Sequence, residues 1–361
     1  MKKQLLAAAV ATAIAAPMTA TAGDVTLGGV MFMSIDSVDL GDTVQTAGPF
    51  NQFPGTNQDA YTPGYDGLAV NTHFSNFFIK GTEDLGNGLS AFFHMEFLIS
   101  PDDNNAVSNN RNTYVGLAGN WGKVGIGRND SPYKKSTGGL ELFGNLAGDY
   151  QNIGFHDVRM QNTLFYYSPN WNGFSFGAAI GMPSNDSVGP ATPFEGSDGV
   201  EEVSLAGTYK NGPWFASLAY EERSQEFLGF ANNPIGDDHE KWRMGLGYTA
   251  NGFHVGFIYE DNDSFGGNGE IDYDVYRISG SYSFGNNVVK AAYSRMDVDS
   301  SNVIGILVDE PDQFSIGLDH KLSKRTKLFA TYTDFDGDDN NLIVGDDYDY
   351  DVFSVGIVHK F

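Results

Sequence analysis

The sequence predicts an all-β protein, a transmembrane antiparallel barrel of about 16 strands. Its 361 residues include 45 glycines, 27 phenylalanines and 18 tyrosines but no cysteine, a composition typical of many strands joined by turns. Short runs alternate apolar and polar side chains, and short turns alternate with long polar connections. No part of the chain after residue 22 approaches the roughly 18 to 20 consecutive apolar residues that a membrane-spanning helix needs.

The first 22 residues have the pattern of a secretory signal peptide. Lys2 and Lys3 precede an alanine-rich apolar run, and Ala20 and Ala22 supply the small residues of a cleavage site. We expect export through the periplasm, cleavage near Ala22 and one mature domain over 23–361. Loss of the two lysines would take the formal net charge from −25 to −27. This acidity argues against nucleic acid as a partner, because nucleic-acid-binding proteins carry basic patches.

The rest of the chain divides into strand-like runs that end at turn signals. Every second connection is short and rich in asparagine and glycine, which supply the positive φ of tight hairpins. The connections at 39–72, 129–161, 183–200 and 299–312 are long and polar. Short turns at one edge and long loops at the other are typical of an outer-membrane barrel. In order, the predicted strands cover residues 25–36, 76–84, 89–100, 112–120, 123–130, 162–170, 174–182, 201–210, 214–223, 240–250, 253–262, 273–284, 288–298, 313–323, 327–336 and 350–361.

The alternation within the strands indicates what each face meets. In 240–250, Trp242, Met244, Leu246 and Tyr248 share one face, while the other face carries lysine, arginine, glycine and threonine. A water-soluble sandwich would also alternate, because its apolar face packs between two sheets. Aromatic residues recur near strand ends on the apolar face, however, as expected for girdles at the two membrane interfaces. The polar face, with its many charges and glycines, suits a wet lumen.

The last predicted strand keeps this alternation to its end, where Phe353, Val355, Ile357 and Phe361 share the apolar face. In lipid, each backbone group left unpaired at a sheet edge costs several kcal/mol. We therefore expect this strand to pair with the first strand and close the barrel. Phe361 would then face lipid at the periplasmic rim.

Several stretches resemble the trimeric general diffusion porins of Gram-negative outer membranes. They are "NFFIKGTEDLGNGLSAFFHMEF" at 76–97, "RNTYVGLAGNWGKVGIGRNDSPY" at 111–133 and "NTLFYYSPNWNGFSFGAAIG" at 162–181, together with the terminal strand that ends in phenylalanine. The resemblance runs from about Gly23 to Phe361. It implies a homotrimer in contact with outer-membrane lipid and lipopolysaccharide. It also implies that the outer-membrane assembly machinery reads the terminal strand.

The same resemblance implies that 129–161 folds into the pore and narrows it. Acids on this loop would face basic side chains on the opposite wall, producing a transverse field at the constriction. The chain departs from many enterobacterial relatives at Asn76, where they carry a further arginine. The expected constriction residues are Glu141 and Asp149 on the loop and Arg128, Arg159 and Lys80 on the wall, with Glu96 added because its parity points inward. Other charges with inward parity, His94, Arg243, Glu260, Arg277 and Lys290, are interpreted as solvated wall residues.

No catalytic motif is evident, because the sequence has no cysteine, no H-E-x-x-H and no G-x-S-x-G. His254 and His359 have no convincing serine partner, so we do not expect an enzyme. The segment 334–351 holds eight aspartates and no basic residue, but it lacks the spacing of a calcium-binding loop. We expect no cofactor and no metal centre, although loose divalent cation binding at this acidic loop is compatible with the sequence.

These observations together predict a passive, water-filled pore for small hydrophilic solutes and ions across the bacterial outer membrane. The acidity of the chain and of 334–351 favours weak cation selectivity, which should strengthen as salt is diluted. Two alternatives stay open. One is a substrate-selective channel, which needs an ordered track of aromatic or charged side chains along the lumen. The other is a mainly structural or adhesive barrel with a plugged bore.

Overall fold

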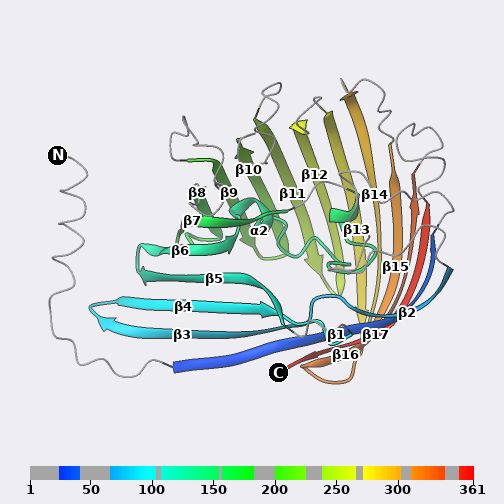
Figure 1. The fold of residues 1–361 in the computed structure, drawn as a ribbon, viewed down its shortest axis with the longest axis horizontal. Helices are drawn as coiled ribbons and strands as arrows, with labels where there is room; N and C mark the ends of the chain where they lie inside the picture. The colour runs from blue at the N-terminus through cyan, green and yellow to red at the C-terminus, as the bar shows by residue number, and fades with distance from the viewer. Residues whose placement is uncertain are drawn as a thin grey trace, which may run out of the picture.

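The computed structural model describes residues 24–40, 66–102, 107–153, 157–182, 200–224, 238–265, 271–301, 310–337 and 349–361. The predicted signal peptide and the middle of the acidic segment 334–351 lie outside these residues. The described residues form one closed antiparallel barrel of 16 strands, as predicted (Figure 1). Among them, no helix is both long enough and apolar enough to cross a membrane.

The strand segments follow one another around the barrel in chain order, each antiparallel to its neighbours. Two short helical segments, α2 (Pro132–Lys135) and η1 (Tyr150–Asn152), lie in the connection between β6 and β7. The strands are β1 (Asp24–Leu40), β2 (Asp66–Thr72), β3 (Asn76–Gly86), β4 (Leu89–Leu98), β5 (Ser108–Gly119), β6 (Gly122–Asp130), β7 (Arg159–Tyr167), β8 (Phe174–Gly181), β9 (Glu202–Asn211), β10 (Trp214–Arg223), β11 (His239–Ala250), β12 (Phe253–Phe265), β13 (Ile271–Phe284), β14 (Asn287–Ser301), β15 (Asp312–Lys321), β16 (Thr326–Asp336) and β17 (Tyr350–Lys360).

Segments β2 and β3 together make one barrel strand, which is why 17 segments give 16 strands. Both pair with β1, β2 along its second half and β3 along its first half. The register shifts by one residue between them, at 73–75. The side chain of Ser75 fills the gap in the ladder, because its Oγ accepts a hydrogen bond of 2.9 Å from the backbone N–H of Phe32. The sequence predicted β3 but placed β2 inside the long connection 39–72.

The barrel closes where β1 meets β17, as the alternation of the last strand predicted. Their register runs from Val30 opposite Lys360 to Leu40 opposite Tyr350. Beyond this ladder, the backbone N–H of Phe361 donates to the carbonyl of Gly29 at 3.1 Å, and the N–H of Gly29 donates back to the carbonyl of Phe361 at 3.2 Å. The outward side chains of this strand, Phe353, Val355, Ile357 and Phe361, are all exposed.

Two bands of aromatic side chains lie on the outer face, one near each edge of the barrel. Near the short turns, Trp214 contacts Tyr248 with ring centroids 4.6 Å apart. Near the opposite edge, Tyr259 contacts Tyr276 at 5.2 Å. Phenol hydroxyls of the second band donate to outward carboxylates, as Tyr259 does to Asp274 at 2.8 Å. These bands confirm the predicted girdles, which place apolar rings toward lipid and polar groups toward water.

Candidate functional site

The described part of the connection between β6 and β7, residues 131–153 and 157–158, lies inside the barrel (Figure 1). Its first turn follows directly from the sequence Asp-Ser-Pro-Tyr-Lys-Lys. Ser131 is the N-cap of α2, with its Oγ accepting from the N–H of Lys134 at 3.0 Å. Pro132 follows at the first helical position, where a missing N–H costs no hydrogen bond. The Ser-Pro pair therefore turns the chain inward immediately after β6.

The rest of this connection lies along the inner wall of the barrel. Leu146 packs against Phe32, Phe329 and Val358, on the strands at the closure. Polar side chains of the wall bind the connection at β9, β13, β14 and β15. In order, Tyr133 N donates to Ser204 Oγ at 3.0 Å, Ser279 Oγ to Leu140 O at 2.9 Å, Lys290 Nζ to Leu142 O at 2.8 Å and Gln313 Nε2 to Ala147 O at 3.0 Å.

Arg243 of β11 binds both ends of the connection. Its guanidinium group donates to the carbonyl of Tyr133 at 3.1 Å, to Thr137 Oγ1 at 2.7 Å and to Asp157 Oδ1 at 2.6 Å. Glu260 of β12 accepts from its Nε at 2.6 Å. All five donors of an arginine are available for such contacts. Arg243 is only 1 % exposed, so the charge is satisfied entirely by these partners.

Arg277 of β13 plays a similar role further along the wall. Its Nη2 donates to Glu141 Oε1 at 2.9 Å and to the carbonyl of Gly148 at 3.0 Å. Glu141 also accepts from the backbone N–H of Tyr150 at 3.3 Å, and Asp149 caps η1 by accepting from Gln151 N at 3.1 Å. Burial, reinforced by Asp149, raises the pKa of Glu141 to about 7 even though Arg277 opposes the shift. Burial likewise raises the pKa of Asp149.

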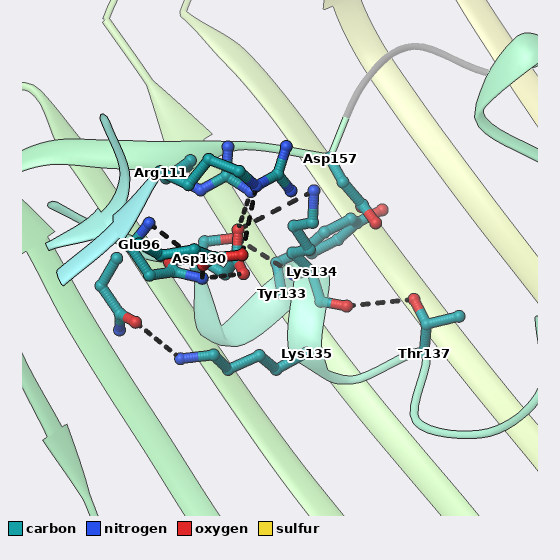
Figure 2. Close-up of polar contacts among 12 residues, drawn as sticks. Glu96, Arg111, Asp130, Tyr133, Lys134, Lys135, Thr137 and Asp157 are labelled. Atoms are coloured by element: carbon teal, nitrogen blue, oxygen red, sulfur yellow. Dashed lines mark hydrogen bonds and ion pairs between the residues drawn. The ribbon is translucent and has the colours of Figure 1, made fainter. Parts of the chain in front are cut away.

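None of the contacts just described involves β3 to β7, and we call the lumen face of these strands, together with α2 beside it, the open wall. Its charged residues gather beside α2 (Figure 2). Arg159 Nη2 lies 2.8 Å from Asp130 Oδ1, and Arg111 Nε lies 3.5 Å from Glu96 Oε1. The side-chain amide of Asn112 donates to both carboxylates, to Glu96 at 3.0 Å and to Asp130 at 2.8 Å. This amide links the two ion pairs into one network.

Four further basic groups lie on the open wall beside this network, and Lys123 of β6 lies over the ring of Tyr167. Lys134 Nζ lies 3.9 Å from Asp130 Oδ1. Lys135 Nζ donates to Tyr167 Oη at 2.7 Å, and burial lowers the pKa of Lys135 to about 8. Arg128 forms no ion pair with any residue that the structure describes, and it lies close enough to Arg111 and Arg159 to repel them. Lys80 is exposed to the lumen.

The structure therefore brings together only part of the predicted constriction. Arg159 and Glu96 belong to the charge network of the open wall, and Arg128 and Lys80 lie on the same wall. Glu141 and Asp149 do not reach them, because the first is paired with Arg277 and the second caps η1. Their part in the constriction stays a prediction. The sequence missed Arg111, Asp130, Lys134 and Lys135, although the Ser-Pro helix start flanked by Asp130 and the two lysines could have indicated three of them.

One interpretation from the sequence is wrong. Arg243, Glu260, Arg277 and Lys290 have the predicted inward parity, but they are buried and not solvated. The reason is that the inward connection covers their strands. Parity places a side chain on the lumen face, and only the tertiary contact decides whether water reaches it. His94 differs, because it lies on the open wall and is partly exposed.

The chain is similar to known outer-membrane proteins both in sequence and in fold. A family model described as Gram-negative porin matches residues 6–340. The chain is 28% identical to outer membrane porin protein 32 of Delftia acidovorans over 91% of this chain and 88% of that protein. The solved structure of the anion-selective porin from Comamonas acidovorans aligns with 94% of this chain over 100% of its own length, with a TM-score of 0.70 and 24% sequence identity. The trimer form of OmpT from Vibrio cholerae aligns with 94% of this chain over 100% of its own length, with a TM-score of 0.65 and 12% sequence identity.

Proposed function

Because the chain belongs to the Gram-negative porin family and is an outer-membrane diffusion channel, we propose that its pore admits small hydrophilic solutes passively and favours anions. One observation carries this proposal: the basic residues of the open wall outnumber its carboxylates. The carboxylates there are Asp84, Glu96 and Asp130. The basic groups are Lys80, Arg111, Lys123, Arg128, Lys134, Lys135 and Arg159.

The other basic residues of the lumen do not change this balance, because the inward connection uses them. Arg243 is paired with Asp157 and Glu260, and Arg277 with Glu141. Lys290 binds a carbonyl of the connection and lies 3.6 Å from Asp319. A solute that passes between the connection and the open wall therefore meets mainly the excess positive charge of the open wall. Low-dielectric protein on both sides concentrates this field in the lumen.

The anion preference replaces the weak cation preference expected from the net charge. Many of the acidic residues lie outside the lumen, on the outward faces at the ends of the strands near the long connections. On these faces Glu222 lies directly opposite Glu240, and Asp334 lies directly opposite Asp351. At about 0.15 M salt the Debye length is roughly 8 Å, so charges outside the barrel wall act weakly inside it. At about 0.01 M their reach grows to roughly 30 Å, and the anion preference should then weaken.

Two of the similar solved structures are consistent with the proposal. One is the anion-selective porin from Comamonas acidovorans, and another is the trimer form of OmpT from Vibrio cholerae. We propose that this chain also forms a homotrimer, in contact with outer-membrane lipid and lipopolysaccharide. Mass measurement after extraction in a mild detergent tests the assembly, and a monomer as the only species would contradict it.

Planar-bilayer recording from the purified protein tests the proposed function. We expect discrete conductance steps and, across a potassium chloride gradient above about 0.1 M, a zero-current potential whose sign reports chloride preference. Absence of steps would favour the alternative of a plugged structural barrel. A potential of the opposite sign at these salt concentrations would contradict the proposed anion preference.

A further inference from the structure

A row of aromatic rings runs across the open wall. The ring centroids of Phe78 and His94 are 5.5 Å apart with an interplanar angle of 25°, and those of His94 and Tyr114 are 5.4 Å apart at 20°. Phe165 lies 5.2 Å from Tyr114 and Tyr167 lies 5.6 Å from Phe165. Phe165 is only 2% exposed, so it supports its neighbours from within the wall, while Phe78, His94, Tyr114 and Tyr167 are partly exposed. The rings come from β3, β4, β5 and β7, so the row crosses the strands of the open wall.

Glycines of neighbouring strands let these rings lie against the wall. A Cβ built on Gly28 would come within 2.6 Å of the ring of Phe78, and one built on Gly177 within 2.9 Å of the ring of Tyr167. The rings thus occupy the space in which side chains of the next strand would project. Phe165 covers Gly125 in the same way. Rings packed on backbone have little rotational freedom, and the row is therefore preorganised before any solute arrives.

Basic groups lie beside both ends of the row. At one end Lys80 Nζ is 5.2 Å from the centroid of Phe78. At the other end Lys135 Nζ is 4.5 Å and Lys123 Nζ 5.1 Å from the centroid of Tyr167. A solute that lies along the rings can therefore place a negative group next to an ammonium group at either end.

The aromatic rings and the ammonium groups together favour one chemical class of solute. A small inorganic anion would use the lysines but make no use of the rings. A neutral sugar could stack on the rings but would leave the adjacent ammonium groups without a counter-charge. A flat ring that carries a carboxylate satisfies both features, because offset stacking suits planar π systems and the carboxylate pairs with lysine.

We propose that the aromatic row is a binding track for monocyclic aromatic carboxylates. The proposal rests on the anion-favouring pore described above and adds a substrate class to it. A bound aromatic carboxylate occupies the lumen for longer than an aliphatic one of the same charge. The channel would therefore pass benzoate selectively at low concentration and saturate at high concentration.

Bilayer recordings with three carboxylates test the proposal. Benzoate, cyclohexanecarboxylate and acetate carry the same charge, and the first two have rings of similar size of which only benzoate is planar. We expect benzoate to cause saturable current interruptions and the other two to cause none at equal concentration. Equal behaviour of benzoate and cyclohexanecarboxylate would overturn the inference.

Two variants assign the effect to the row. Tyr114→Leu and Phe78→Leu each remove one ring and should weaken the benzoate block by roughly twofold to tenfold. Phe253→Leu removes a ring from the lipid-facing surface and should leave the block unchanged. A block that both lumen variants retain in full would also overturn the inference.

The chloride–potassium zero-current potential separates this inference from the proposed function. If chloride preference is present and the benzoate block is absent, the aromatic track fails and the anion-favouring pore stands. If the pore prefers potassium, both fail.

Discussion

Arg243 and Asp157 form a buried ion pair of 2.6 Å that ties the returning end of the inward connection to β11. The same arginine holds the first turn of the connection through Tyr133 and Thr137. One side chain thus holds both ends of the connection, while Arg277, Lys290 and Gln313 hold the part between them. Tyr150 Oη, which donates to Asp157 at 2.7 Å, extends the contact to η1.

Arg243→Met should lower the free energy of unfolding by about 3–5 kcal/mol, because it leaves Asp157 and Glu260 buried without a counter-charge. It should also raise current noise in the open channel as the connection loosens. Denaturant unfolding and single-channel recording measure the two effects. Arg295 provides a matched control, because it also pairs with two carboxylates but is 44% exposed. Arg295→Met should cost at most about 1 kcal/mol, and an equal loss in both variants would contradict the assigned role of Arg243.

Arg128→Gln should reduce the chloride preference of the pore. Arg128 makes no close ion pair with a carboxylate among the described residues, although Asp130 lies near enough to attract it, so most of its charge acts on passing ions. By Coulomb's law, a unit charge at about 8 Å in water contributes roughly 0.5 kcal/mol, close to twofold in the permeability ratio. Arg295→Gln removes the same charge from the outer face and should change the ratio much less. Zero-current potentials across a salt gradient provide the measurement, and equal shifts in the two variants would show that the field originates elsewhere.

The sequence predicted the barrel well because lipid and water enforce strict alternation on each strand. All of the predicted strands are present, from the first at 25–36 to the last at 350–361. The exception is β2, "DGLAVNT", whose continuity with β3 is broken at 73–75. That break depends on the contact of Ser75 with Phe32, 43 residues earlier, and no local pattern encodes it.

The charge distribution of the site was less predictable than the fold. Arg128 and Arg159 could be placed because they flank the inward connection in sequence. Glu141 was expected to face these arginines, yet its partner is Arg277, 136 residues away in the chain. Parity assigns both residues to the lumen but cannot say which charges meet there. The preference for anions or cations depends on those pairings, so the net charge of the chain cannot by itself predict it.

The proposed chloride preference should fall as pH rises from about 6 to 9, because Glu141 gains a negative charge and Lys135 loses a positive charge. Glu141, with a pKa of about 7, becomes ionised in the lower part of this range. Lys135, with a pKa of about 8, becomes neutral in the upper part. Glu141→Gln should flatten the lower part of the profile, and Lys135→Gln the upper part. Profiles that both variants leave unchanged would assign the titration to other groups.

The raised pKa of Glu141 also predicts the direction of a stability effect. Because this pKa lies above the ordinary value of 4.5, the folded protein binds more protons than the unfolded chain between the two values. The contribution of Glu141 to stability is therefore complete below about pH 4.5 and is lost as pH rises through about 7. Glu141→Gln should reduce the difference in unfolding free energy between pH 5 and pH 8. An unchanged difference would contradict the shift.

Phe361 packs at the end of the seam between β1 and β17. The ring of Phe361 lies over Gly29, where a Cβ would come within 2.5 Å of it, and the two residues exchange backbone hydrogen bonds. Phe361→Ala removes this cover from a ladder end that faces lipid. Because the ring is about half exposed, at 48%, we expect a loss of about 1–2 kcal/mol, less than for a fully buried phenylalanine. Phe353→Ala, on the same face of the same strand, is the matched control for losing an outward ring. The two variants should lose similar amounts of stability. If the outer-membrane assembly machinery also recognises the terminal strand, Phe361→Ala should lower the amount of protein recovered from the outer membrane far more than Phe353→Ala does. Equal recovery of the two variants would restrict Phe361 to packing at the seam.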